Sequence, residues 1–387
     1  MKKRNLFLVG VLSLSILMTG CGGEKTSSST TGGSTPTAAE ETIKIGWYGP
    51  LTGPAAADGT DSRNGAQLAV DQFNRVGGLD GKKVELITED DQGKPEEALK
   101  AVQKLMNRDK VVAIVDGAYS GSSKTVAPKV QAGQVPMVVS IATHPDVTKG
   151  GEFVSRVVYT GPVQGKAMAN YAVNDLQKKN IAGLYVEADY GKSVFGAFKE
   201  EVEKLGGKIA MERTFRFGDK DFSSLLTAVK AANPDALYVV GYYNEAASIA
   251  NQMKELGIDV PLLGVDGFDS PKFLELTRKN SEGAIFSTSF YKEDQRPIVQ
   301  DFVREWTNKY KSDPSMVSSQ GYDAAMVILE GLRKAGTDKE KLAKAIHEIK
   351  DLEGTSGKIS FGPDHEVIKP IIFMTVKDGK FQFVTSK

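Results

Sequence analysis

The sequence has 387 residues, with 49 Lys and Arg against 49 Asp and Glu, and a single cysteine. The balanced charge argues against a nucleic-acid partner or a polybasic membrane contact, and one cysteine excludes an intrachain disulfide. About 345 residues follow the N-terminal segments, too many for one ordinary core, so we expect two domains.

Residues 1–20 are typical of a secretory signal peptide. Lys2, Lys3 and Arg4 precede an apolar run that is too short for an ordinary membrane span, and their removal would leave a net charge of about −3. The run ends in Met18-Thr19-Gly20-Cys21, which resembles a lipobox, so we expect Cys21 to be acylated and to become the new N-terminus. The alternative is a chance cysteine. Residues 21–41 are rich in Ser, Thr and Gly, which predicts a flexible, lipidated tether.

Strand and helix patterns then alternate, which predicts an α/β fold with parallel sheets and right-handed crossovers. Buried β-branched runs indicate the strands, and apolar residues at helical spacing indicate the helices. In the first series we expect strands at Ile43–Trp47, Val84–Thr88, Val111–Val115 and Pro136–Val139, with helices at Ser62–Arg75, from Pro95, and from about Ser122 to Gln134. In the second we expect strands at Ile181–Val186, Lys208–Thr214, Ala236–Val240 and Pro261–Val265, with helices at Ser193–Leu205, Phe222–Ala232 and Glu245–Leu256.

The last hundred residues predict a return of the chain. A strand at Ala284–Ser287 is followed by two helix faces, one containing Trp306 and the other Tyr322. We interpret these aromatic stripes as core. The tail predicts antiparallel strands, with Lys377-Asp378-Gly379 as a hairpin turn; they are Lys358–Phe361, Ile371–Val376 and Phe381–Val384.

Small hydroxyl residues follow two neighbouring predicted strands. Val111–Val115 leads to a segment that contains Ser120, Ser122 and Ser123, and Pro136–Val139 leads to Thr143. Ligands bind beyond the carboxyl ends of strands in open parallel sheets, and a helix N-terminus favours an anion such as a carboxylate. The alternative is that Ser122 or Ser123 only caps a helix.

Several motifs, in their order, resemble those of the leucine–isoleucine–valine-binding family of ABC-transporter solute-binding lipoproteins, over Ile43 to about Phe383. The resemblance implies the type I periplasmic binding protein fold, in which two Rossmann-like lobes with open parallel sheets are joined by a three-segment hinge. It implies lobe one at 43–160 plus 289–354 and lobe two at 161–288 plus 355–387. The motifs are Gly49-Pro50-Leu51-Thr52-Gly53-Pro54, Gly59, Asn64–Val70, Asn74–Gly81, Asp90-Asp91 with Pro95, Asp189-Tyr190-Gly191 and Tyr322-Asp323-Ala324.

The resemblance also implies a pocket for an amino acid between the lobes. Ser120 and Thr143 would donate to the carboxylate, the Ile141 carbonyl and the Thr143 hydroxyl would accept from the ammonium, and Asp266 would supply the opposite charge. Without the resemblance, Asp266 would indicate only a turn, and the tyrosines ordinary buried aromatics. The implied ligand-binding residues are Ser120, Ile141, Ala142, Thr143, Tyr190, Tyr242 and Asp266, with Tyr119 and Asp58 near the ligand's side chain.

Asp58 departs from the family pattern. The residue before the glycine that matches Gly59 is often aromatic in the family and covers an apolar side chain. An inward Asp58 would need a donor, so we hypothesise that a polar or cationic amino acid competes with the branched aliphatic ones, with Tyr119 beside it. The alternative is that Asp58 turns outward or caps the following helix.

Motifs for catalysis are lacking. The segment Tyr190–Ser193 ends like a Walker A loop, but Val186 occupies the place of its first glycine. His144, His347 and His365 have no metal-site spacing, so we expect neither an enzyme nor a metal or other cofactor. We predict a monomeric extracytoplasmic receptor, lipid-anchored at the cell surface or in the periplasm, that delivers an amino acid to the transmembrane subunits of an ABC permease. The alternatives are an amide or urea-like solute, or a ligand sensor without transport.

Overall fold

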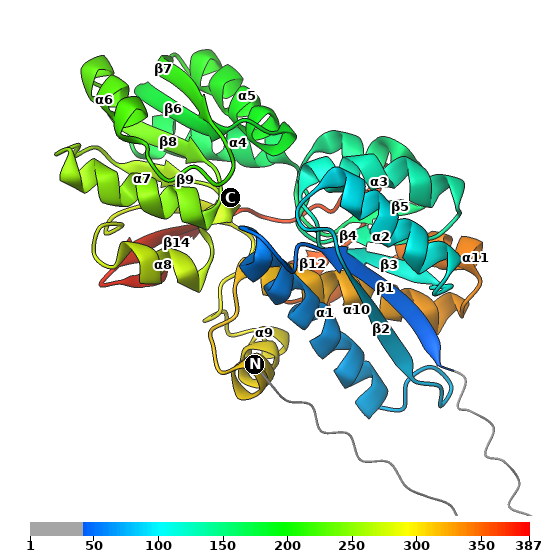
Figure 1. Cartoon of the computed structure of the whole chain (residues 1–387). Coiled ribbons are helices and arrows are strands. Elements are labelled where there is room, and N and C mark those ends of the chain that lie inside the picture. Colours follow the sequence, from blue (N-terminus) through cyan, green and yellow to red (C-terminus); the bar gives the residue numbers. More distant parts are fainter. Residues whose placement is uncertain (1–41) are drawn as a thin grey trace, which may run out of the picture. The chain divides into compact units, whose positions relative to one another are not determined.

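The computed structural model describes residues 42–387 (Figure 1). The predicted signal peptide, Cys21 and the tether lie outside the described residues. Within 42–387, no helix is both long and apolar enough to cross a membrane.

The first lobe is built on a five-stranded sheet in the order β2-β1-β3-β4-β5, with every neighbouring pair parallel. Alternation along the strands sends Trp47 and Val115 to one face and Tyr48 and Ile114 to the other. Helices α1 and α10 (Met316–Ala335) cover the first face and α2 and α3 the second (Figure 1). The strands are β1 (Ile43–Gly49), β2 (Val84–Asp90), β3 (Ala113–Asp116), β4 (Met137–Val139) and β5 (Val154–Arg156), and the helices are α1 (Ala56–Arg75), α2 (Pro95–Asn107) and α3 (Ser120–Ala132).

The second lobe contains a seven-stranded sheet in the order β14-β13-β10-β9-β8-β6-β7. Its β10-β9-β8-β6-β7 part is parallel, whereas β13 and β14 are antiparallel additions at one edge. The strands are β6 (Asn180–Val186), β7 (Lys208–Phe215), β8 (Ala236–Val240), β9 (Leu262–Gly264), β10 (Ile285–Thr288), β13 (Ile372–Lys377) and β14 (Lys380–Ser386). The helices are α4 (Gly161–Asn170), α5 (Asp189–Lys204), α6 (Ser223–Ala232), α7 (Tyr243–Glu255) and α8 (Pro271–Thr277).

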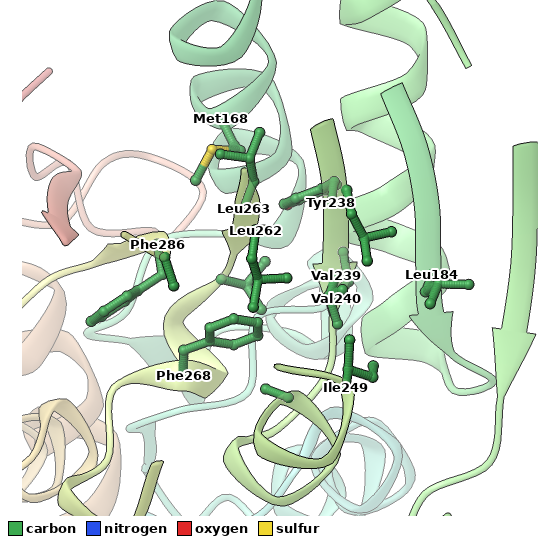
Figure 2. Packing of buried hydrophobic residues seen from close by; sticks show 14 of the residues in the cluster. Met168, Leu184, Tyr238, Val239, Val240, Ile249, Leu262, Leu263, Phe268 and Phe286 are labelled. Carbon is green, nitrogen blue, oxygen red and sulfur yellow. The ribbon is translucent and has the colours of Figure 1, made fainter. Parts of the chain in front are cut away.

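The core of this lobe is continuous from sheet to helices. Figure 2 shows Val239 and Val240 of β8 beside Leu263 of β9, with Phe268 and Ile249 contributed by the segments that follow these strands. Each of these side chains is fully buried. The loops after β8 and β9 therefore start from strand ends that are held in place by core packing.

The chain returns to the first lobe through α9 (Pro297–Tyr310), α10 (Met316–Ala335) and α11 (Lys339–His347). A separate hairpin follows, made of β11 (Leu352–Gly354) and β12 (Gly357–Ile359). Ile359, Phe361 and Val367 belong to the core of the first lobe. We therefore propose that the last crossing between lobes lies after Val367 and not near Gly354.

The predicted fold class is confirmed, as are the predicted strands and most helices, usually to within two residues. Four helices begin earlier than expected, including α5, which starts at Asp189 and not at Ser193, and α7, which starts at Tyr243 and not at Glu245. α1 starts at Ala56 and not at Ser62, and this start has no sequence signal because its N-cap, Ala55, has no capping side chain. α3 starts at Ser120, so Ser122 and Ser123 lie inside the helix, and the idea that one of them caps it was wrong.

Candidate functional site

The residues predicted to bind a ligand follow the carboxyl ends of parallel strands in both lobes. In the first lobe, Asp58 comes after β1, Tyr119 and Ser120 after β3, and Ile141 after β4. In the second lobe, Tyr190, Tyr242 and Asp266 come after β6, β8 and β9. These seven residues meet at one cavity, whose lining is Asp58, Tyr119, Ser120, Ile141, Tyr190, Tyr242, Asp266, Gly267, Asp269, Met316 and Val317.

The cavity contains little free space. Its volume is about 30 Å³, enough for about two water molecules. The two lobes make contacts beside it: the Lys124 ammonium lies 2.8 Å from the Asp189 carboxylate, and the Tyr119 ring stacks on that of Tyr242, with centroids 4.3 Å apart. A solute the size of an amino acid can therefore enter only if the lobes part or Tyr119 moves.

Two of the predicted residues, Ala142 and Thr143, are not part of the lining. Both are buried, with 1% of their surface exposed. The Thr143 hydroxyl has no hydrogen-bond partner within residues 42–387. Ser120, which does line the cavity, accepts a hydrogen bond on its hydroxyl from the backbone N–H of His144 at 3.3 Å. Ser120 thus anchors the segment that carries Thr143.

Arg156 holds the same segment from β5. Its side chain is fully buried, and its Nη1 donates to the carbonyls of Ala142 and His144 at 2.9 and 2.8 Å. Its Nε donates to Glu366 at 2.8 Å, which compensates the buried charge. The backbone on both sides of Thr143 is therefore fixed. Sequence reasoning missed Arg156, although a cation in a short buried strand was a usable signal.

Asp266 begins a 3-10 turn, Asp266–Phe268, so it has the turn role as well as a place in the cavity. Its Oδ1 accepts hydrogen bonds from the Tyr190 hydroxyl at 2.6 Å and from the Gly267 N–H at 2.9 Å. Only 4% of the residue is exposed. Burial raises the pKa of the carboxyl group, although the Tyr190 hydrogen bond acts to lower it. A cation placed here would offset the cost of burying this charge.

Asp58 faces inward. It lies in the first turn of α1, with 6% of its surface exposed, and its Oδ2 accepts a hydrogen bond from the Tyr119 hydroxyl at 2.7 Å. It neither turns outward nor caps α1. The next residue, Gly59, lets the first turn of α1 lie close to Pro50, because a Cβ at Gly59 would be 1.7 Å from the Pro50 carbonyl oxygen. Burial and, to a smaller extent, the nearby acids raise the pKa of Asp58 to about 7, against the lowering effect of the Tyr119 hydrogen bond.

Sequence reasoning missed four residues of the lining. Asp269 follows Asp266 by three residues in the same turn, and this spacing was a usable signal. Its carboxylate accepts a hydrogen bond from the Thr288 hydroxyl, and burial raises its pKa to about 7. Met316 and Val317 start α10 and reach the cavity through tertiary packing, which no local pattern indicates. Gly267 is the fourth lining residue that the sequence reasoning missed. No group of side chains in residues 42–387 is arranged to hold a metal ion.

The periplasmic binding protein family model matches residues 42–380. The Leu/Ile/Val-binding protein homolog 3 of Brucella melitensis is 31% identical over 337 residues, 86% of this chain and 90% of that protein. A leucine-binding protein of Thermotoga maritima has a TM-score of 0.84 and 34% identity, covering 89% of this chain and 98% of that one. The branched-chain amino acid transporter substrate-binding protein of Streptococcus pneumoniae, solved with isoleucine, has a TM-score of 0.84 and 32% identity, covering 90% of this chain and 99% of that one.

These similarities extend over both lobes and confirm the predicted resemblance. They also agree with the sequence in indicating a binding protein and not an enzyme. The chain belongs to the periplasmic binding protein family, as a solute-binding protein of an ABC transporter.

Proposed function

We propose that the protein binds an α-amino acid in the cavity between its lobes and delivers it to the permease. The observation that carries this proposal is the meeting, at one cavity, of Ser120 and Ile141 from one lobe with the buried Asp266 from the other. Hydroxyl and N–H donors near the start of α3 suit a carboxylate, and Asp266 suits an ammonium. An α-amino acid carries both groups on one carbon.

Closure of the lobes is the step that couples binding to transport. The solute touches residues of both lobes only when the cleft is shut, so it shifts the population toward the closed form. The permease then distinguishes the closed form from the open one. The three crossings between lobes are the segments that would move.

The names of the relatives favour a branched-chain amino acid as the default solute. The Brucella protein is named for leucine, isoleucine and valine, and the Streptococcus protein was solved with isoleucine. Their identity to this chain, 31% and 32%, leaves room for different side-chain contacts around a shared head-group site.

We also propose that Cys21 is acylated and holds the protein at the outer face of the cell membrane. This rests on the lipobox-like Met18-Thr19-Gly20-Cys21 after a basic and apolar leader. A monomer tethered in this way would stay near the permease, its membrane partner.

A thermal-shift screen of the full chain against L-amino acids tests the proposal. A solute at a hundred times its dissociation constant should raise the free energy of unfolding by about 2.7 kcal/mol. The matched controls are the amides of the same amino acids, which lack the carboxylate, together with urea and simple amides. Stabilisation by urea or an amide, but by no amino acid, would contradict the head-group assignment.

A further inference from the structure

The cavity is lined by an excess of acidic side chains. Three carboxylates line it, those of Asp58, Asp266 and Asp269, and each residue is less than a tenth exposed. The lining, all of which lies in the described part of the chain, includes no Lys, Arg or His. An amino acid with an uncharged side chain brings one ammonium and one carboxylate, so it leaves this excess unchanged.

The partners that these carboxylates have within residues 42–387 are neutral. Tyr119 donates to Asp58, Tyr190 to Asp266 and Thr288 to Asp269. A neutral donor satisfies one oxygen of a buried carboxylate but does not cancel its charge.

Two lysines on neighbouring elements are engaged elsewhere. Lys124 pairs with Asp189 on α5, and Lys272 lies 2.6 Å from Glu275. The other charged groups that act on Asp58 are Asp61, Glu245 and Asp266, all acids.

Asp58 is the carboxylate best placed for a second positive charge. Asp266 is assigned to the ligand's ammonium, and Asp269 accepts a hydrogen bond from Thr288 of β10. The Tyr119 hydroxyl occupies only Oδ2 of Asp58, and the described residues give Oδ1 no hydrogen bond. The stacked rings of Tyr119 and Tyr242 lie beside it, and aromatic faces attract cations.

We propose that the solute is an amino acid whose side chain carries a positive charge, such as lysine, ornithine or arginine, and that Asp58 pairs with this charge. This inference rests on the proposed function, because the α-ammonium and carboxylate are assigned to Asp266 and Ser120. A leucine or valine side chain would leave Asp58 facing apolar carbons, which is costly for a buried carboxylate. A glutamine side chain would donate to Asp58 but would leave its charge unpaired.

Isothermal titration calorimetry of the full chain tests the inference, with L-lysine, L-ornithine and L-arginine against L-leucine, L-valine and L-glutamine. We expect the basic amino acids to bind at least tenfold more tightly than the others. Asp58→Asn should weaken their binding by about 30-fold or more, the loss typical of removing one member of a desolvated charge pair. It should leave leucine binding unchanged or strengthen it, because the buried charge that faces the apolar side chain is removed. The matched control is Asp61→Asn, on the same helix but outside the lining.

The outcomes separate this inference from the proposed function. If leucine or valine binds more tightly than lysine and arginine, or glutamine binds as tightly, the basic side chain is wrong while the amino-acid function stands. If no amino acid binds, both fail. Should Asp58→Asn not fold, Asp269→Asn provides a second variant, for which we expect a several-fold loss for the basic amino acids alone; an equal loss for leucine and lysine would overturn the inference.

Discussion

Asp266→Asn removes one charge from the cavity and keeps the size of the side chain, with the Gln164 side chain as the one further contact that the new amide group affects. The asparagine carbonyl oxygen can still accept from the Tyr190 hydroxyl and the Gly267 N–H, the two hydrogen bonds that Asp266 Oδ1 now makes. Asparagine has nearly the same shape as aspartate, so the 3-10 turn should keep its geometry. The variant, compared with a control ligand that lacks the ammonium, therefore tests the role of the charge.

The expected loss of affinity follows from burial. Asp266 is 4% exposed, so the ligand ammonium would lose a charged partner in a site almost free of water. Such a loss costs about 2–5 kcal/mol, or roughly 30- to several-thousand-fold in affinity. Ser120→Ala should cost less, about 1–3 kcal/mol, because backbone donors remain.

Stability should change in the other direction. Burial raises the pKa of Asp266, so the folded protein holds this proton more tightly than the unfolded chain. The cost of carrying the ionised form appears as the pH rises above the unfolded pKa and is complete above the folded pKa. At pH 8 the unliganded Asp266→Asn protein should therefore be at least as stable as the wild type.

Calorimetry at pH 8 with the tightest amino acid measures the loss, and the matching 2-hydroxy acid is the control ligand. That ligand lacks the ammonium, so wild type and variant should bind it with similar affinity. Wild-type affinity of Asp266→Asn for the amino acid would refute the role assigned to Asp266. An equal loss for both ligands would indicate a general distortion of the site.

Three further predictions concern the anchor, the closed form and pH. Cys21→Ala should release the protein from membrane fractions or stall its processing, as measured by fractionation and mass. Lys124→Ala breaks the ion pair with Asp189, and because both side chains are about 40% exposed, it should weaken ligand binding by no more than about fivefold. Burial raises the pKa of Asp58 and of Asp269 to about 7. As the pH rises from 4 to 8, Asp58→Asn and Asp269→Asn should therefore increase the free energy of unfolding relative to the wild type, by up to about 4 kcal/mol each. Melting curves recorded across this pH range measure the difference.

Each of these predictions has a clear contrary result. Unchanged membrane retention of Cys21→Ala with normal processing would count against the lipobox. A loss above about 30-fold in Lys124→Ala would mean that Lys124 contacts the solute and not only the other lobe. A constant difference in melting temperature between wild type and Asp58→Asn at all pH values would show that Asp58 does not titrate as its burial implies.

The sequence predicted most of the fold because period and strand composition are local signals. β8 was predicted to the residue, and the turn before β14 follows from Asp378 and Gly379, both with positive φ. The start of α1 was missed because Ala55, its N-cap, has no capping side chain. For the hairpin β11–β12, the sequence predicted a strand only near β12. The place of this hairpin in the first lobe depends on core contacts of Ile359 and Phe361 with residues far away in the chain.

The site was predictable where residues follow parallel strands and match a motif. Seven of the nine proposed ligand residues line the cavity, while Ala142 and Thr143 do not. Their burial depends on Arg156, whose contacts join residues 142 to 366 and have no local signature. The direction of Asp58 was left open by the sequence, because it is set by the Tyr119 hydroxyl from another strand end.

A crystal structure with the tightest amino acid from the screen tests the central claim most directly. We predict that its carboxylate lies within hydrogen-bond distance of Ser120 and its ammonium within that distance of Asp266, with both lobes in contact with the solute. An amino acid bound outside this cavity, or held in it with the head group turned away from Asp266, would contradict the account.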